Sequence, residues 1–275
     1  MVKSIRVKGF KKISDTTFKL DRINIFVGAN NSGKSSVLQA VQFAIGTAQT
    51  GSRVGIRRNS TGDSESFTAD ASSFLYLPIR ELEALIHDRN LTQSVGADIT
   101  FSTETEETTI SIKRGKNRNL AIAMSVSNLL PALKDTKTPF CVYTPGLSGI
   151  SISEEFKTKA VVLKSATRGD SNLYLRNVLL LLKEKSSSWE KFAESVQRFF
   201  SGYVIEVKFS PEADETIDVH VKAKDEEGKM IELPIDAMGT SALQVLQILS
   251  YVYYFNPPLL ILDEPDTHLH SNNQR

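Results

Sequence analysis

The residues that could most readily do chemistry lie in one short stretch, from Gly28 to Ser35. Gly28 and Gly33 enclose four residues, and a lysine and a serine follow directly. Two glycines let the backbone curl until successive N–H groups converge on phosphate oxygens. The ammonium of the lysine would then bind the terminal phosphates of a nucleotide, and the serine hydroxyl would bind magnesium. We therefore predict an ATP-binding loop formed by Gly28, Ala29, Asn30, Asn31, Ser32, Gly33, Lys34, Ser35 and Ser36.

Such a loop needs a strand before it and a helix after it. Residues 23–27 alternate and are rich in branched and aromatic side chains, which predicts a strand. Residues 34–46 place apolar side chains on one face, which predicts an amphipathic helix. The N-terminus of this helix would add partial positive charge beside the phosphates. The alternative is a glycine turn before an ordinary helix.

A second chemical feature lies near the end of the chain. Residues 259–262 are apolar, and Asp263 and Glu264 follow them. We expect a fully buried strand of the parallel-sheet type, with the two acids at its end. In phosphoryl transfer the first carboxylate would contact magnesium through water, and the second would position or polarise the attacking water. Two acids at the end of a strand are often only solvated surface residues. The pair indicates a phosphoryl-transfer site only because the chain also contains the loop at Gly28.

The rest of the chain predicts a mixture of strands and helices. Residues 2–27 should contain two or three strands, and the polar residues 47–71 should form a mobile insertion. Three serines at 186–188 should form a hinge between two helices. We expect antiparallel strands within 97–125, a strand followed by a turn at 139–151, and a hairpin of two strands at 203–209 and 216–224. Helices are expected at 81–87, 172–185 with Ser171 as its cap, 189–200 and 240–255.

Composition narrows the class of protein. The net charge is +1 and charged residues make up 24% of the chain, so nothing global requires a polyanionic partner. Cys141 is the single cysteine, which excludes a disulfide framework within the chain and suits a reducing cytosol. No run approaches the ~18 apolar residues of a membrane span. We expect a soluble, cytoplasmic protein with no membrane partner.

Several stretches resemble one branch of the ATPases. Residues 262–270 resemble the extended Walker B and D-loop of ABC-type ATPases, in particular the branch that contains the OLD (overcoming lysogenization defect) family, RecF and the SMC heads. Residues 5–12 are similar to the opening of that branch, and residues 30–35 are similar to its Walker A loop. Residues 145–150 and 168–179 are also similar to ATPases of this group. The resemblance spans most of the chain.

The resemblance implies an α/β fold, that of an ABC-type P-loop NTPase head. Such a head has a mixed or parallel sheet core, an antiparallel β subdomain and a helical lobe. All of 1–275 would be a single ATPase domain, in which residues 1–150 and 203–275 form the nucleotide-binding core and residues 155–200 a helical insertion. The sequence ends before the strand that normally carries a switch histidine. We therefore expect the N-terminal part of a longer protein, or a curtailed head.

The resemblance also implies that ATP lies between two copies that close head to tail. The signature helix of one copy would face the loop of the other, and a candidate signature follows Met238. Its N–H and hydroxyl groups could donate to a γ-phosphate. A serine stands where a second glycine is usual, and Thr240 could instead act as a simple N-cap. The signature residues acting in trans would be Gly239, Thr240 and Ser241.

Roles for single residues follow from the same resemblance. Lys34 and Glu264 would be the catalytic residues, and Ser35 and Asp263 would bind Mg²⁺. The cofactors would be ATP and Mg²⁺.

Other charged residues are weaker candidates for binding ATP, a metal or nucleic acid. Basic residues after the phenylalanine at position 10 often lie near the nucleotide in this branch, which makes Lys11 and Lys12 candidates for ATP binding. His268 and His270 are expected to shape the contact between subunits rather than to bind a metal. Two basic clusters could meet nucleic-acid phosphates, although the nearly neutral chain favours a solvated surface for both. They are Arg53, Arg57 and Arg58, and Lys113, Arg114, Lys116 and Arg118.

Together these features predict a Mg·ATP-hydrolysing ATPase that forms a homodimer or higher oligomer through its ATP sites. Its ATP state would be transmitted to an effector, a nuclease or another toxin, in the same chain or operon. Bacterial anti-phage defence is the setting that the analogy favours. Two alternatives stay open: a RecF-like DNA-repair ATPase that binds nucleic acid, and a nucleotide-gated scaffold with little turnover. An SMC protein is disfavoured because no coiled coil interrupts the chain.

Overall fold

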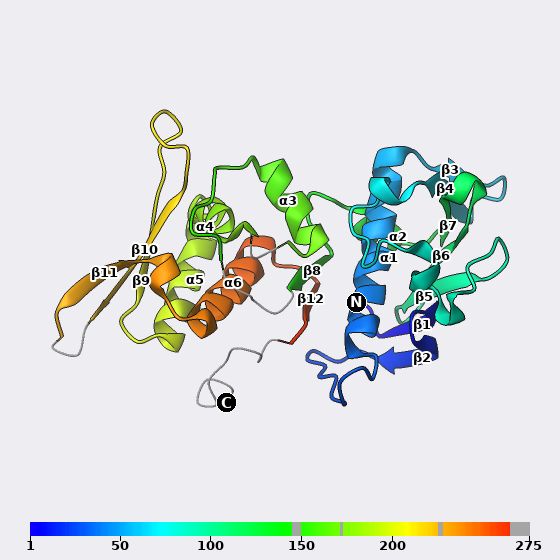
Figure 1. The fold of residues 1–275 in the computed structure, drawn as a ribbon, viewed down its shortest axis with the longest axis horizontal. Helices are drawn as coiled ribbons and strands as arrows, with labels where there is room; N and C mark the ends of the chain where they lie inside the picture. Colours follow the sequence, from blue (N-terminus) through cyan, green and yellow to red (C-terminus); the bar gives the residue numbers. More distant parts are fainter. Residues whose placement is uncertain (145–149, 171–172, 225–227, 265–275) are drawn as a thin grey trace. The chain divides into compact units, whose positions relative to one another are not determined.

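The computed structural model describes residues 1–144, 150–170, 173–224 and 228–264. The chain forms two compact units, Met1–Cys141 and Val142–Arg275, which are described separately. The ribbon is shown in Figure 1. None of the helices in the described ranges is both long and apolar enough to cross a membrane.

The first unit is built on a seven-stranded sheet of order β2-β1-β5-β6-β7-β4-β3 (Figure 1). All its strand pairs are antiparallel. The prediction of antiparallel strands over 97–125 is confirmed, because three strands of the sheet lie there. The strands are β1 (Ser4–Phe10), β2 (Ile13–Lys19), β3 (Arg57–Arg58), β4 (Ser64–Ala69), β5 (Gly96–Ser102), β6 (Glu107–Arg114) and β7 (Leu120–Ser125).

One long helix, α1 (Lys34–Val54), packs against this sheet. The predicted helix over 34–46 is confirmed at its start but continues for two further turns. The expected mobile insertion at 47–71 is therefore wrong. Thr50 explains why the helix continues, because its hydroxyl donates to the Gly46 carbonyl (2.7 Å) and accepts from the Leu75 N–H (3.0 Å). A polar side chain satisfied in this way can be buried within a helix.

Residues 23–27 do not form the predicted strand. Ile23, Ile25 and Val27 are 78%, 81% and 88% exposed. Alternation of side chains favours a strand only where a neighbouring strand offers its hydrogen-bonding edge. Here a turn after β2 leads the chain away from the sheet: Asp21 N–H donates to the Asn24 side chain (3.0 Å), and the Asn24 amide donates back to the Asp21 carbonyl (2.9 Å).

The expected helix at 81–87 is also wrong. Two short 3-10 turns occupy this region, Leu82–Leu85 and His87–Arg89. Ile86 is extended (φ −103°, ψ 145°) between the two turns, which interrupts any helical path. Two further 3-10 turns lie at Ala71–Ser73 and Lys116–Arg118, and a short helix, α2, spans Leu130–Lys134.

In its described residues, the second unit combines four α-helices and a 3-10 turn at Ile235–Ala237 with two small sheets. A core of apolar side chains joins the helices to an antiparallel sheet of order β11-β10-β9, and β12 pairs with β8 in a two-stranded sheet. The hairpin predicted over 203–224 is confirmed. β11 was not predicted, and α3 was expected only as part of the helical insertion 155–200. The elements are β8 (Cys141–Thr144), α3 (Lys159–Arg168), α4 (Leu175–Lys183), α5 (Ser186–Phe199), β9 (Val204–Lys208), β10 (Asp218–Lys224), β11 (Met230–Pro234), α6 (Thr240–Phe255) and β12 (Leu259–Leu262).

Three details of the second unit bear on the predictions. The helix over 240–255 is confirmed with the same bounds, as α6. The serines at 186–188 begin α5 instead of forming a hinge. The strand over 259–262 is present, but only Ile261 is buried, so the expectation of a fully buried strand is wrong. A strand paired in a two-stranded sheet keeps more of its surface exposed than one inside a large sheet.

The chain therefore has a mixed α/β fold with a large antiparallel sheet and several helices. The predicted parallel or mixed core is absent from its seven-stranded and three-stranded sheets, whose described pairs are antiparallel throughout. The grouping of residues 1–150 with 203–275, and of 155–200 as an insertion, stays a prediction.

Candidate ATP-binding site

The loop at Gly28 curls sharply into the start of α1. Asn31 and Gly33 have positive φ values of 68° and 102°, so the backbone turns twice within three residues. The Ser32 N–H donates to the Ala29 carbonyl (3.2 Å), and the Val37 N–H donates to the Gly33 carbonyl (3.0 Å) to begin the helix. Left-handed residues placed in this way turn backbone N–H groups toward a common centre, which suits an anion.

Lys34 bends back over the loop that precedes it. Its ammonium donates to the carbonyls of Gly28 (2.7 Å) and Ala29 (3.1 Å). Both acceptors are neutral oxygens, and a phosphate oxygen is a stronger acceptor for an ammonium. A Cβ on Gly28 would lie 2.8 Å from the Ser32 hydroxyl, so a larger residue there would push the loop open.

The first turn of α1 adds a favourable electric field. Ser35 and Ser36 are half-buried in this turn, and the turn contains no acidic residue. The partial positive charge of the helix N-terminus is therefore not offset by an acid of the turn itself. The helix start and the loop together form a concave run of donors of the kind that binds phosphate.

Two more lysines lie close to this run of donors. Lys12 reaches the loop itself, with its ammonium 3.5 Å from the Asn31 carbonyl. Lys11 reaches α1 one turn beyond Ser35, where its ammonium donates to the Gln39 side chain (2.5 Å). Burial lowers the pKa of the Lys11 ammonium. The structure thus brings Lys11, Lys12 and Lys34 to one end of α1.

The turn that contains Lys11 is held by contacts with Leu85 and His87, which were not predicted from the sequence. Lys11 has a positive φ of 48°, and its N–H donates to the Leu85 carbonyl (2.8 Å). The Nδ1 atom of His87 lies 2.9 Å from the Lys11 carbonyl. His87 is far away in the sequence and belongs to no motif, so no local signal could have found it.

The acid pair lies in the second unit, after β12. The Asp263 carboxylate accepts a hydrogen bond from the Tyr143 hydroxyl (2.9 Å), and its N–H donates to the Thr144 carbonyl (3.0 Å). Glu264 is exposed and has a positive φ of 50°. Tyr143 was not predicted. Its ring fills the space beside Gly169, where a Cβ would lie 2.7 Å from the Tyr143 Cδ1 atom.

The candidate signature begins α6, as expected. Thr240 is the first residue of the helix, and Gly239 is its N-cap, so the alternative of Thr240 as the N-cap is wrong. The Gly239 carbonyl accepts the N–H groups of Ala242 (3.0 Å) and Leu243 (3.1 Å). No acidic residue lies in this first turn, and the described atoms leave open space beside Gly239.

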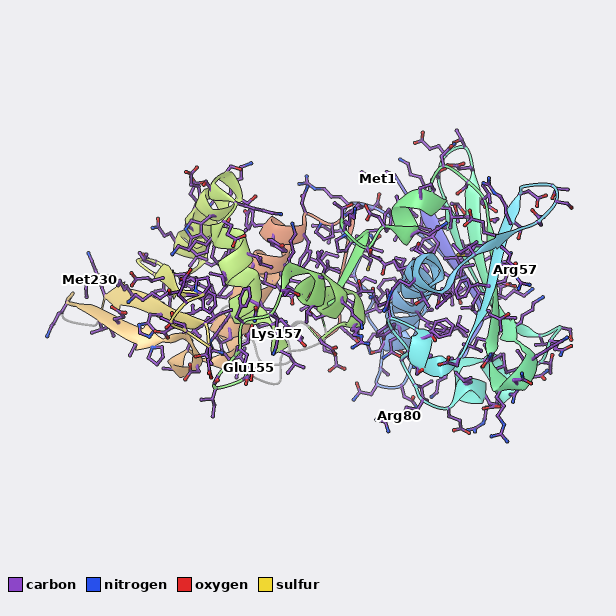
Figure 2. The ribbon with its side chains drawn as sticks, turned by 90° about the horizontal axis from the view of Figure 1, so that it is seen from above. Met1, Arg57, Arg80, Glu155, Lys157 and Met230 are labelled. Atoms are coloured by element: carbon purple, nitrogen blue, oxygen red, sulfur yellow. The ribbon has the colours of Figure 1, made fainter. Side chains whose placement is uncertain are left out.

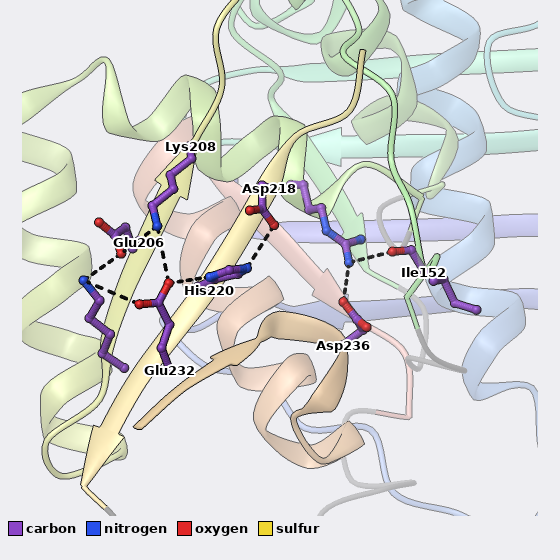
Figure 3. A network of polar contacts seen from close by, with 9 residues as sticks. Ile152, Glu206, Lys208, Asp218, His220, Glu232 and Asp236 are labelled. Carbon is purple, nitrogen blue, oxygen red and sulfur yellow. Dashed lines mark hydrogen bonds and ion pairs between the residues drawn. The ribbon is translucent and has the colours of Figure 1, made fainter. Parts of the chain in front are cut away.

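A buried arginine fixes the segment that precedes this helix start. Arg176 on α4 is only 4% exposed, and its guanidinium donates to the carboxylate of Asp236 (2.9 Å). It also donates to the carbonyls of Ser151 (2.6 Å) and Ile152 (3.2 Å). Figure 3 shows Asp236 and Ile152 joined through this guanidinium. Asp236 is three residues before Gly239, so Arg176 positions the approach to the signature.

The carboxylate of Glu154 completes this network. It accepts the N–H groups of Arg176 (2.9 Å) and Asn177 (2.8 Å), at the start of α4. The Asn177 side chain donates to it as well (2.7 Å). A carboxylate at a helix N-terminus satisfies donors that the helix itself leaves without partners. Burial nevertheless raises the pKa of Glu154 above its ordinary value.

The loop at Gly28 lies within a region that matches a known protein family. The family model described as AAA ATPase domain matches residues 1–138. The chain belongs to the AAA ATPase domain family. No curated protein matches the sequence significantly. Membership of the AAA ATPase domain family indicates nucleotide binding and ATPase activity.

The match to the AAA ATPase domain covers the loop, α1, Lys11, Lys12 and the seven-stranded sheet. The acid pair and the signature follow the matched region, and they lie in the other compact unit. Their assignment to the ATP site stays a prediction. Several predicted features lie outside the described residues: the similar stretch at 145–149, a possible helix cap at Ser171, and the histidines His268 and His270.

Proposed function

We propose that this AAA ATPase domain hydrolyses Mg·ATP as a head of the OLD-related ABC type. The observation that carries the proposal is the loop itself. Lys34 is folded over the loop on neutral carbonyls, at the N-terminus of a helix whose first turn contains no acid. A nucleotide phosphate could replace those carbonyls with little rearrangement of the lysine.

Each candidate residue then has a role that its chemistry supports. The loop N–H groups and Lys34 bind the β- and γ-phosphates, and Lys11 and Lys12 add positive charge at the same end of α1. Ser35 and Asp263 offer a hydroxyl and a carboxylate, hard oxygen donors of the kind that Mg²⁺ accepts. When bound, Mg²⁺ neutralises charge that develops on the phosphates. Glu264 positions the attacking water.

The proposal also covers how copies of the chain assemble and how they act on an effector. Gly239, Thr240 and Ser241 would act on the nucleotide bound by a second copy, so that binding of ATP closes a homodimer or higher oligomer. Hydrolysis would reopen it and change the state of an associated effector, a nuclease or another toxin. Anti-phage defence is the proposed setting, and it rests on analogy with the OLD-related group alone.

The test measures ATP hydrolysis and oligomeric state together. Wild type, Lys34→Ala and Glu264→Gln are compared with and without Mg·ATP, using phosphate release and light scattering after size exclusion. The matched control is Glu190→Gln, which changes an exposed glutamate on α5. Loss of the residue that positions the water should reduce turnover by a factor of roughly 10² to 10⁴.

The expected pattern is specific to the proposed roles. Glu264→Gln should bind ATP, accumulate as the closed assembly and scarcely turn over, whereas Lys34→Ala should bind ATP roughly 100-fold more weakly. If Glu264→Gln hydrolyses ATP at the wild-type rate, the catalytic assignment is wrong. If the wild type assembles identically without nucleotide, ATP does not control closure, and a constitutive scaffold replaces the proposed switch.

A further inference from the structure

The face of the seven-stranded sheet away from α1 carries small polar side chains. On β4, Phe67 points toward the helix, where a Cβ on Gly51 would lie 2.9 Å from its ring, and the neighbouring Ser66 and Thr68 are exposed. Strand register places Ser66 beside Arg57 on β3 and Thr68 beside a small alanine of β7. This outward face therefore has donors and little bulk.

A hollow of about 640 Å³ lies on this face. Its lining includes two cations from strands that are not adjacent in the sequence, Arg57 on β3 and Lys113 on β6. Hydroxyl groups of Ser66, Thr68 and Ser111 line it as well. No lining residue is acidic. The sheet thus joins two basic clusters that are separate in the sequence.

The two cations of the hollow differ from others of the same unit. In the described part of the chain, the side chains of Arg57 and Lys113 make no ion pair or hydrogen bond. By contrast, Arg6 pairs with Asp15, Arg114 pairs with Glu83, and Lys134 pairs with Glu65. Cations without an acidic partner are available to an external anion.

The acids nearest the hollow are already engaged. Glu65 is adjacent to Ser66 in the chain but pairs with Lys134 (2.6 Å). Asp98 on β5 accepts a hydrogen bond from the Ser111 hydroxyl (2.6 Å), and it marks the side of the hollow that repels anions. An anionic ligand would therefore lie over β3, β4, β7 and Lys113 rather than across β5.

The positive surface is larger than one phosphate needs. Gly115 begins the turn between β6 and β7, and a Cβ there would lie 3.1 Å from the Thr68 methyl, so this turn borders the hollow. Cations with no ion pair in the described ranges flank the hollow at the end of α1, on β3 and in this turn. They are Arg53, Arg58, Lys116 and Arg118.

We propose that this hollow binds the phosphodiester backbone of a nucleic acid through Arg57 and Lys113. Repeated phosphates match a row of cations that extends beyond a single pocket, and hydroxyl donors are usual partners of phosphate oxygens. Small side chains on β4 and β7 allow the backbone to approach closely. The proposal adds a ligand and a surface to the ATPase, and it does not depend on the loop at Gly28. Figure 2 marks Arg57 on its strand.

The test measures binding of a short fluorescein-labelled oligodeoxynucleotide, single-stranded and duplex, by anisotropy over a range of salt concentrations. The test variant is Arg57→Ala/Lys113→Ala. A control with the same change in net charge is Lys208→Ala/Lys222→Ala on the three-stranded sheet. There Lys222 pairs with Glu206 (2.8 Å). Lys208 pairs with Glu232 (3.3 Å), and Figure 3 labels both residues.

We expect oligonucleotide affinity to fall only when residues of the hollow are changed. Arg57→Ala/Lys113→Ala should weaken binding roughly 10-fold at low salt. For two lost phosphate contacts, the slope of log K against log salt should fall by about 1.4 for the single strand and about 1.8 for the duplex. The control double variant should bind like the wild type. Ser66→Glu, which places a carboxylate beside Arg57 on an exposed position, should weaken binding in the same direction without removing a cation.

Five results would overturn the proposal. They are no oligonucleotide binding by the wild type at low salt, equal binding by the wild type and the Arg57→Ala/Lys113→Ala variant, and equal losses in the two double variants. The fourth is loss of oligonucleotide binding in Lys34→Ala, which would place the phosphates at the ATP loop. A labelled mononucleotide that binds as tightly as the oligonucleotide and is lost with Arg57 and Lys113 would show a site for one phosphate, which also contradicts a nucleic-acid backbone.

Discussion

The two compact units hold their important cations in opposite ways. In the first unit, Lys34 and Lys12 rest on backbone carbonyls and Lys11 on a glutamine amide, all neutral oxygens. In the second unit, Arg176 is buried, pairs with the carboxylate of Asp236 and donates to two carbonyls. The first arrangement can exchange its partners for a ligand, and the second cannot.

The difference follows from the cost of losing a partner. A partly exposed ammonium that leaves a neutral carbonyl can be solvated or can bind phosphate, so little free energy is lost. A buried guanidinium that loses a carboxylate keeps a charge without compensation inside the protein. The comparison therefore assigns ligand binding to the lysines of the loop and a structural role to Arg176. Single substitutions can separate the two roles.

The largest effect on stability is expected for Arg176→Ala. It removes a buried side chain with its hydrogen bonds to the Asp236 carboxylate and to the carbonyls of Ser151 and Ile152. Loss of hydrogen bonds to a charged group costs about 1.5–3 kcal/mol, and the lost packing of the buried arginine adds to this. Urea unfolding should show the loss, with Arg198→Ala on the exposed side of α5 as the matched control. Equal unfolding free energies for the two variants would contradict the structural role.

Lys34→Ala should separate binding from stability. The variant loses hydrogen bonds only to neutral carbonyls, so its unfolding free energy should stay within about 1 kcal/mol of the wild type. Its affinity for Mg·ATP should fall roughly 100-fold, because a charge-assisted contact to phosphate contributes about 2–3 kcal/mol. Calorimetric titration measures this, with Lys19→Ala at the exposed end of β2 as the control. Unchanged affinity would remove Lys34 from the site.

A smaller effect, with a definite sign, is expected from Glu154. Burial raises the pKa of this carboxyl above its ordinary value of 4.5, so the folded state binds the proton more readily than the unfolded state. Its contribution to stability is therefore fully present below pH 4.5 and is lost as the pH rises through the higher folded pKa.

The measurement compares the wild type with Glu154→Gln by urea unfolding at several pH values. The glutamine cannot titrate, so the difference between the two unfolding free energies isolates the carboxyl. As the pH rises from about 4 to 7, that difference should move in favour of Glu154→Gln. A shift in favour of the wild type over the same range would show that hydrogen bonds from Arg176 and Asn177 outweigh burial.

Much of the fold was predictable where local pattern decides it. The bounds of α6 and the three strands over 97–125 follow from periodicity within each element. The errors at 23–27 and 47–71 have one cause, because tertiary partners decided both. A chain segment that looks like a strand found no edge to pair with, and a polar segment was buried because Thr50 found partners at Gly46 and Leu75.

The contacts of the candidate residues were likewise predictable only where they are local in the sequence. The loop was predictable because its chemistry lies in consecutive residues, and the lysine acts on carbonyls only five and six positions away. Arg176 and Asp236 are 60 residues apart, and Tyr143 and Asp263 are 120 apart. No periodicity or motif links residues at such distances, so one sequence cannot show these pairs.

Tyr143→Phe gives the smallest expected effect and sharpens the comparison at the Asp263 carboxylate of the second unit. It removes one neutral donor from the Asp263 carboxylate and keeps the ring beside Gly169, so stability should fall by only about 0.5–1.5 kcal/mol. If Asp263 binds magnesium, the freed oxygen should also change the Mg²⁺ concentration that half-saturates ATP hydrolysis. Tyr203→Phe, whose ring stacks on Phe200, is the matched control. An Mg²⁺ dependence that is identical in both variants would mean that Tyr143 does not orient Asp263 for magnesium and that their hydrogen bond is structural, like those of Arg176.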